Sequence, residues 1–196
     1  PKGKWSFKVG MTKESECVDC GTGKFGIEDI GAKAETSCKE CGRGRYLGKV
    51  GSFGDTSCLV CPLGYIQNDT GRAFCLPCTP GSFGHQNGTS ECINCAIGRS
   101  SKTVARKTEC KVCTKGRYQS ETGATACLNC IPGQYQPQQE QATCLDCEKD
   151  SFTNISSQAA CTPCLIGEYT IDAKSASCQS CNAGSFGQGC KKCPSG

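Results

Sequence analysis

The hydrophobic pattern of this chain has no helical periodicity, and its apolar positions recur at a fixed interval in short extended segments. The interval is set by eleven Cys-x-x-Cys pairs, which run from Cys17/Cys20 to Cys190/Cys193. From Cys58 to Cys178 the first cysteines of the pairs stand 17 residues apart, with one interval of 18. Such a period indicates a tandem array of one small unit.

Each unit has a glycine and an aromatic residue at fixed places after the second cysteine of a pair. The glycine stands at position +3, where it predicts a positive φ or a close backbone approach, and Asp150 replaces it once, as one of the few residues that tolerate this conformation. The glycines are Gly23, Gly44, Gly64, Gly81, Gly98, Gly116, Gly133, Gly167, Gly184 and Gly196. The aromatics at position +5 are Phe25, Tyr46, Phe83, Tyr118, Tyr135, Phe152, Tyr169 and Phe186.

Positions +3 and +5 lie on one face of an extended strand, so we expect the ring over a neighbouring disulfide, in space that the glycine leaves free. Polar steps such as Asn87-Gly88 predict a reversal, and a small residue two places before the next pair predicts a returning strand there. The unit is therefore expected to be a hairpin. We expect the glutamine-rich stretch 134–141 to be the solvated tip of its unit.

Composition excludes a conventional hydrophobic core. The chain has 22 cysteines in 196 residues, 7% aromatic residues, and one Met and one Trp. Each unit buries too little apolar surface to offset the ordering of its backbone, so covalent bonds must supply the stability. Such density of disulfides indicates an extracellular or cell-surface location. The sequons at Asn68, Asn87 and Asn154 agree and are the expected N-glycosylation sites.

The period predicts four segments along the chain. Residues 1–16 are expected to be a cap or the end of a preceding domain, and 17–57 hold two longer repeats. The regular repeats occupy 58–181, and 182–196 hold a short repeat and the start of the next, which suggests a piece of a longer protein. The net charge of +4 is too small to indicate nucleic-acid or membrane-surface binding.

The unit Cys-x-x-Gly-x-[Phe/Tyr] followed by the next pair, as in 130–144 and 78–92, resembles a known module. It is similar to the ephrin-receptor-like cysteine-rich repeat and to the simplest module of tumour-necrosis-factor-receptor cysteine-rich domains. The resemblance implies a small disulfide-rich fold, mostly β or irregular with little or no helix: an elongated rod of repeats, each touching only its neighbours.

The resemblance also implies that the second cysteine of each pair bonds the first cysteine of the next. That pairing is Cys20–Cys38, Cys41–Cys58, Cys61–Cys75, Cys78–Cys92, Cys95–Cys110, Cys113–Cys127, Cys130–Cys144, Cys147–Cys161, Cys164–Cys178 and Cys181–Cys190. Cys17 and Cys193 would then need partners beyond the sequence. A 1–3, 2–4 pairing within blocks of two pairs remains open, although it strands one pair because eleven is odd.

Metal and redox chemistry are the sharpest alternatives. Two Cys-x-x-Cys pairs separated by 13 to 17 residues overlap the spacing of zinc ribbons, but ribbons do not usually tile as an unbroken row. Redox catalysis needs one low-pKa pair at a helix N-terminus, which this pattern lacks. The single histidine, His85, lies in a polar turn and is expected to be exposed rather than a general base.

The sequence therefore predicts a non-enzymatic extracellular rod without cofactors, part of a larger surface, matrix or filament protein such as an algal or protist surface fibre. Its partners would be other copies or neighbouring extracellular proteins, with N-linked glycans, no nucleic acid and no membrane contact. The alternative is a receptor or adhesion ectodomain that binds a protein ligand. In that case the irregular first two repeats, with Lys24, Arg43, Arg45, Lys49 and Phe53, are the candidate surface. A multi-zinc protein is the remote alternative.

Overall fold

The structure, a computed structural model, describes residues 2–27 and 33–194. Gly196, predicted as a repeat glycine, lies outside them. The chain divides into two compact units, 1–93 with 103–109 and 94–102 with 110–196. The described residues form short antiparallel hairpins and contain no α-helix, so the small disulfide-rich, mostly β or irregular fold class is confirmed. No helix in them is long and apolar enough to cross a bilayer.

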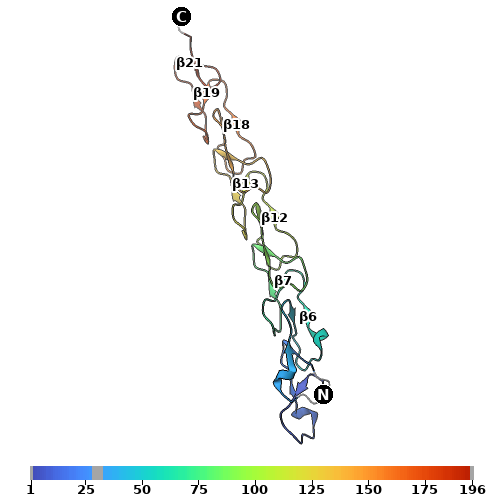
Figure 1. Cartoon of the computed structure of the whole chain (residues 1–196). Coiled ribbons are helices and arrows are strands. Elements are labelled where there is room, and N and C mark those ends of the chain that lie inside the picture. The colour runs from blue at the N-terminus through green and yellow to red at the C-terminus, as the bar shows by residue number, and fades with distance from the viewer. Residues whose placement is uncertain (1, 28–32, 195–196) are drawn as a thin grey trace. The chain divides into compact units, whose positions relative to one another are not determined.

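The described strands form two-stranded antiparallel sheets, one for each repeat (Figure 1). The first six sheets are β1 (Lys4–Trp5) with β2 (Val18–Asp19), β3 (Lys24–Gly26) with β4 (Cys38–Glu40), β5 (Arg45–Tyr46) with β6 (Leu59–Val60), β7 (Tyr65–Ile66) with β8 (Leu76–Pro77), β9 (Ser82–Phe83) with β10 (Ile93–Asn94), and β11 (Arg99–Ser100) with β12 (Lys111–Val112). The others are β13 (Arg117–Tyr118) with β14 (Leu128–Asn129), β15 (Gln134–Tyr135) with β16 (Leu145–Asp146), β17 (Ser151–Phe152) with β18 (Thr162–Pro163), β19 (Glu168–Tyr169) with β20 (Gln179–Ser180), and β21 (Ser185–Phe186) with β22 (Lys191–Lys192).

The returning strand of each hairpin is formed by the two residues inside a Cys-x-x-Cys pair. Tyr135 lies opposite Leu145 and Gln134 opposite Asp146, for example. The expectation of a returning strand at the small residues before the pair was therefore wrong. In the longer repeats two of those residues, Thr36 and Thr56, lie in single 3₁₀ turns, η2 (Glu35–Ser37) and η3 (Asp55–Ser57), and η1 (Glu14–Glu16) precedes Cys17 in the same way.

Ten disulfides close the repeats as rings. They join Cys20–Cys38, Cys41–Cys58, Cys61–Cys75, Cys78–Cys92, Cys95–Cys110, Cys113–Cys127, Cys130–Cys144, Cys147–Cys161, Cys164–Cys178 and Cys181–Cys190. Cys17 and Cys193 lie outside these bonds. The disulfides are also the core, because all the buried hydrophobic residues that the structure describes are cysteines except Phe25, Leu47 and Phe83.

The N-terminal residues form a hairpin of the same kind as the repeats. Gly3 has a φ of 73° and its carbonyl accepts a hydrogen bond from the Cys20 N–H, as the repeat glycines do from the cysteines that follow them. Trp5 takes the place of the repeat aromatic, opposite Val18 in the sheet. Lys4 forms an ion pair with Asp19 (3.0 Å), and this hydrogen bond raises the pKa of Lys4 above its ordinary value. This segment therefore has the local structure of a repeat body.

Candidate functional site

The repeat glycines form contacts between repeats that are two apart along the chain. A Cβ atom at Gly116, in the Cys113 repeat, would lie under 3.0 Å from the carbonyl oxygen of Ser157, in the Cys147 repeat. The same holds for Gly3 with Gly51, Gly23 with Gly71, Gly44 with Gly88, Gly64 with Ala105, Gly98 with Glu140 and Gly133 with Lys174. The prediction that each repeat touches only its neighbours was therefore wrong. The glycine makes room for a backbone carbonyl, not for its own aromatic ring.

Hydrogen bonds tie each of these contacts to the repeat between the two partners. The Gly116 N–H donates to the Gln136 carbonyl (2.8 Å), and the Ser157 N–H donates to the Cys130 carbonyl (2.9 Å). Gln136 and Cys130 both belong to the intervening Cys130 repeat. Three successive repeats thus share one backbone network. The first contacts the third directly, and both are hydrogen-bonded to the repeat between them.

The carbonyl that fills a glycine site comes from a residue in the left-handed backbone region. In four described repeats this residue has a side chain, namely Ala105, Glu140, Ser157 and Lys174, with φ between 53° and 65°. The conformation costs such residues roughly 1–2 kcal/mol each. The hydrogen bond to a cysteine carbonyl and the packing on a glycine hold it in place, as strained conformations require. Asp150 also has a positive φ, 63°, which confirms the prediction made for it.

The residue at position +6 is buried in most repeats, and where it is glutamine its amide closes the loop from inside. Gln136 is 4% exposed; its Nε2 donates to the Thr143 carbonyl (2.7 Å), and its Oε1 accepts from the Gln138 N–H (3.1 Å). Gln67 and Gln119 make the same two bonds in their own repeats. The expectation that 134–141 is simply a solvated tip was therefore wrong for Gln136. Polar residues recurring at one place in the period were the signal that could have revealed it.

In two described repeats the residue at the aromatic position contacts the disulfide of the following repeat. Phe25 belongs to one buried cluster with Leu47 and the Cys41–Cys58 bond. Ser100, which replaces the aromatic, places its Oγ 3.3 Å from the Cys127 sulfur. The expected ring over a neighbouring disulfide is confirmed for Phe25.

Side chains opposite the aromatic position form a recurring exposed aliphatic set. They are the first residues inside the cysteine pairs: Val18, Leu59, Leu76, Ile93, Leu128 and Leu145, each 43–54% exposed. In the first unit, Leu76 and the 64% exposed Phe74 border a groove of about 400 Å³, which Gln67 and Arg72 also line. Exposed apolar side chains beside a groove, as at Phe74 and Leu76, suit contact with another protein.

The charged and aromatic residues of the first two repeats are mostly engaged within the chain. Lys24 lies 3.8 Å from both Glu35 and Glu40, and Arg45 forms an ion pair with Asp55 (2.7 Å). The Lys2 ammonium lies 4.8 Å from the centre of the Phe53 ring. Of the five residues proposed as a receptor surface, Arg43 and Lys49 are exposed without such a contact among the described residues.

The three sequon asparagines, Asn68, Asn87 and Asn154, are exposed in their loops. Thr89, the hydroxyl residue of the Asn87 sequon, has a buried Oγ1 without a hydrogen-bond partner in the described structure. His85 is exposed, and its ring centre lies 5.7 Å from that of Phe83. Within residues 2–27 and 33–194, no three His, Cys, Asp or Glu side chains are grouped as metal ligands.

The hairpin geometry and the ring disulfides agree with a comparison against known families. Residues 133–181 match the family described as tyrosine-protein kinase ephrin type A/B receptor-like. This part of the chain is ephrin-receptor-like. The match covers the Cys147 and Cys164 repeats and most of the Cys130 repeat, and two-stranded hairpins recur in the other described repeats. No curated protein matches the chain. The similarity to tumour-necrosis-factor-receptor modules stays a prediction.

Proposed function

We propose that this chain is a non-enzymatic structural segment of an extracellular surface, matrix or filament protein. Its many disulfides and its ephrin-receptor-like repeats suggest an extracellular or secreted protein. The observation that carries the structural role is the three-repeat backbone network, because the same backbone links recur in seven places, from Gly3 to Gly133.

The proposed mechanism is resistance to extension. A repeat of 17 residues could be pulled out to roughly 58 Å if its backbone were free. In the Cys130 repeat the disulfide bypasses the loop, since its two Cα atoms lie 5.7 Å apart. The three-residue step from Cys144 to Cys147 adds roughly 10 Å when it is extended, so the disulfide limits a fully stretched repeat to roughly 16 Å. Force then passes through the sulfur bonds, while the loops stay folded.

A spacer role is tested by pulling single molecules. Under force, the oxidised chain is expected to lengthen without steps that correspond to the unfolding of a whole repeat. The reduced chain is expected to show such steps. Gains of about 40 Å per repeat in the oxidised chain would contradict the proposal. Assembly into fibres, seen by electron microscopy of the purified chain, would support a filament subunit over an isolated spacer.

A receptor or adhesion segment is the second candidate, favoured by the exposed Leu59, Leu76 and Ile93 and by the groove beside Phe74. In that case Phe74→Ser and Leu76→Ser should abolish capture of a specific protein ligand from the cell surface while leaving extension under force unchanged. We further propose that glycans at Asn68, Asn87 and Asn154 hydrate the exposed loops and shield them from proteases.

A further inference from the structure

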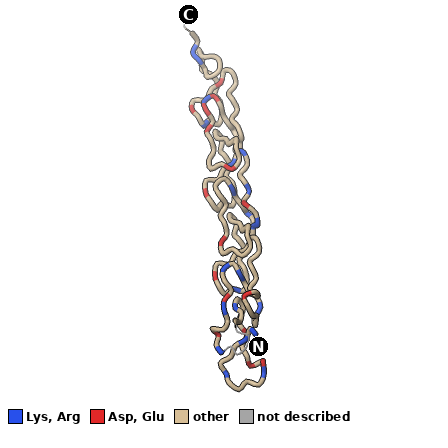
Figure 2. The backbone as a smooth tube through the Cα atoms, turned by 45° about the vertical axis from the view of Figure 1, so that its right-hand side comes forward, with Lys and Arg blue, Asp and Glu red and all other residues tan. Residues whose placement is uncertain are grey.

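Basic residues are concentrated in one stretch of the chain, residues 99–117. Seven lie there with a single acidic residue, Glu109: Arg99, Lys102, Arg106, Lys107, Lys111, Lys115 and Arg117. The rest of the chain has 15 Lys and Arg against 17 Asp and Glu. The net charge of +4 is thus a local excess of cations set in an otherwise slightly acidic chain, whose charges are dispersed along the backbone (Figure 2).

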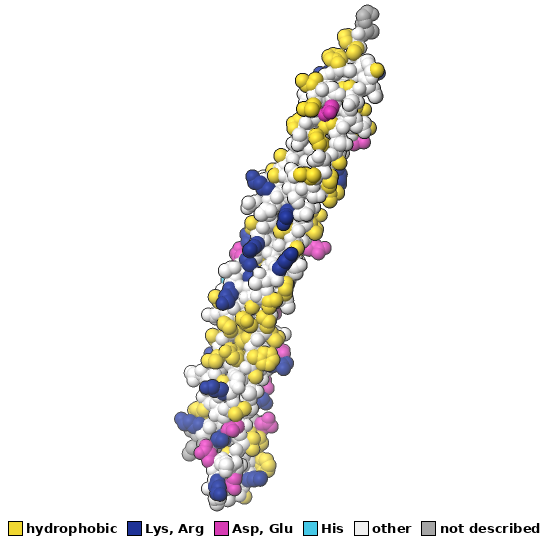
Figure 3. Space-filling model, turned by 180° about the vertical axis from the view of Figure 1, so that it is seen from behind, with side chains coloured by type: hydrophobic (Ala, Val, Ile, Leu, Met, Phe, Trp, Pro, Cys, Tyr) yellow, Lys and Arg dark blue, Asp and Glu magenta, His cyan; other side chains and the backbone are white. Residues whose placement is uncertain are grey.

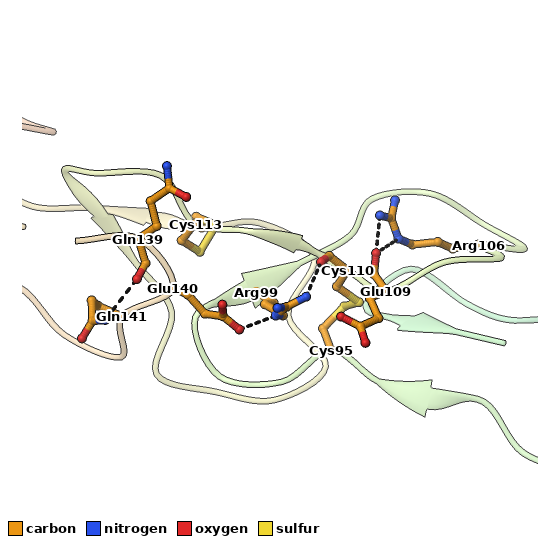
Figure 4. Close-up of polar contacts among 10 residues, drawn as sticks. Cys95, Arg99, Arg106, Glu109, Cys110, Cys113, Gln139, Glu140 and Gln141 are labelled. Carbon is orange, nitrogen blue, oxygen red and sulfur yellow. Dashed lines mark hydrogen bonds and ion pairs between the residues drawn. A yellow bond between two sulfur atoms is a disulfide. The ribbon is translucent and has the colours of Figure 1, made fainter. Parts of the chain in front are cut away.

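Two of the seven have structural roles within the chain, as Figure 4 shows. The Arg99 guanidinium pairs with the Glu140 carboxylate and donates to the Cys110 carbonyl (3.3 Å). Arg106 donates to the Glu109 carbonyl through two of its nitrogens, one of them at 2.8 Å. Both arginines therefore hold loops. The charge of Arg99 is paired with a carboxylate, and the guanidinium of Arg106 is bound to a backbone carbonyl.

Four others, all in the second unit, are exposed and form no ion pair among the described residues: Lys102, Lys111, Lys115 and Arg117. Lys111 lies opposite Ser100 in the β11–β12 hairpin, and Lys102 follows two residues after Ser100. Arg117 starts β13 of the next hairpin, with Lys115 two residues before it. We name these four side chains the basic surface.

The two stretches of the second unit that carry the basic surface contain no acidic residue of their own, and Glu109 and Glu121 flank the second stretch. Residues 94–102 and 110–120 contain neither Asp nor Glu. Figure 3 shows a group of Lys and Arg side chains part-way along the molecule, with few acidic side chains among them. The Cys95–Cys110 and Cys113–Cys127 rings fix the two hairpins, so the cations project from a rigid support. Unpaired cations on two disulfide-closed hairpins attract a polyanion, and the backbone that carries them is already ordered before binding.

We propose that the basic surface binds a sulfated polysaccharide. Repeated sulfate groups match cations on successive hairpins, and such polymers occur where a disulfide-rich protein resides, so this proposal rests on the extracellular location proposed above. Nucleic acid fits less well, because single strands bind by stacking on exposed aromatics. Residues 99–117 contain no aromatic residue, and Tyr118, which follows them directly, is half-buried.

The test uses the whole oxidised chain and heparin as the sulfated probe, at about 0.15 M salt where long-range attraction is screened. The quadruple variant Lys102→Gln, Lys111→Gln, Lys115→Gln, Arg117→Gln should lose about fivefold in affinity for each cation removed. The control Lys8→Gln, Arg43→Gln, Lys49→Gln, Lys149→Gln removes the same charge from exposed sites elsewhere and should bind within about twofold of the parent. Lys102→Arg, Lys111→Arg, Lys115→Arg should retain binding, which separates loss of charge from misfolding.

Three results would overturn the proposal: no heparin binding by the parent chain, equal losses in the quadruple variant and its control, or equal binding of double-stranded DNA. None of them affects the resistance to extension proposed above. Conversely, if whole repeats of the oxidised chain unfold under force, the structural role is rejected. The heparin-binding result is unaffected by that outcome.

Discussion

Gly116 and Ser157 are in direct backbone contact although a whole repeat separates them, and no side chain other than hydrogen fits at residue 116. The carbonyl of Ser157 occupies the space that a Cβ would need, and Gly116 has a φ of 77°. The repeats are therefore coupled beyond their nearest neighbours, so a defect in one should be felt two repeats away.

Gly116→Ala tests this coupling. The backbone conformation alone should cost about 1–2 kcal/mol, and displacement of Ser157 should raise the loss to about 3 kcal/mol or more. Hydrogen exchange should accelerate at the Ser157 N–H as well as at residue 116. Gly167→Ala is the matched control, because Gly167 has a φ of 87° and no atom within 4 Å of its Cβ position. Equal losses in the two variants would show that the contact between distant repeats contributes nothing.

Ala105→Gly is expected to stabilise the first unit. Ala105 has a φ of 53°, and glycine adopts this conformation without the clash between Cβ and the backbone. The gain should be about 0.5–1 kcal/mol after the greater freedom of glycine in the unfolded chain is subtracted. Ala126→Gly, at a residue outside the positive-φ set, should instead destabilise its loop. Both changes can be followed by local hydrogen exchange. Destabilisation by Ala105→Gly would show that Ala105 is not strained by its positive φ.

Gln136→Leu removes the amide that closes its loop from inside. The loss should be about 1–3 kcal/mol, because the Gln138 N–H and the Thr143 carbonyl lose their partners. Exchange at the Gln138 N–H reports the effect directly. Gln134→Leu serves as the control, since the Gln134 amide bonds Asp146 on the exposed side and its loss should stay within about 0.5 kcal/mol. If Gln136→Leu changes neither the stability nor the exchange at the Gln138 N–H, the buried amide does not stabilise the loop.

Thr89→Val should stabilise the unglycosylated chain by about 1 kcal/mol, because it removes a buried hydroxyl that lacks a partner. In a glycosylating host the same change should remove the glycan at Asn87, whereas Thr89→Ser should keep it. Peptide mapping after enzymatic release, which converts glycosylated Asn to Asp, reads out all three sequons. A glycan that persists at Asn87 in Thr89→Val would contradict the expectation.

The sequence predicted the local unit well because cysteine, glycine and aromatic residues obey one period. Positive φ at the glycines and at Asp150, and the reversal at Asn87-Gly88, follow from residue type alone. The strand inside each cysteine pair was missed, because two residues carry no periodicity of their own. The position of Thr36 was misassigned, since a small residue fits a tight turn as well as a strand.

Contacts between repeats could not be derived from residue types. Nothing in the identity of Ser157 indicates that its carbonyl lies on Gly116, because the link is made by backbone atoms that every residue has. Gln136 could have been recognised through its recurrence with Gln67 and Gln119, but a glutamine-rich stretch suggests solvent when it is considered alone. The exposed Leu76 and Leu145 follow from the hairpin register, which was not known before the returning strand was located.

The pairing of the cysteines tests the account most directly, because rings closed within each repeat underlie the contacts, the stability and the proposed resistance to force. The oxidised chain should be alkylated without reductant, digested and mapped by mass spectrometry. The account predicts ten linked peptide pairs that join the second cysteine of each pair to the first cysteine of the next, from Cys20–Cys38 to Cys181–Cys190, and no alkylation at those twenty residues. Alkylated cysteines accompanied by bound zinc, or links that skip a repeat, would contradict it.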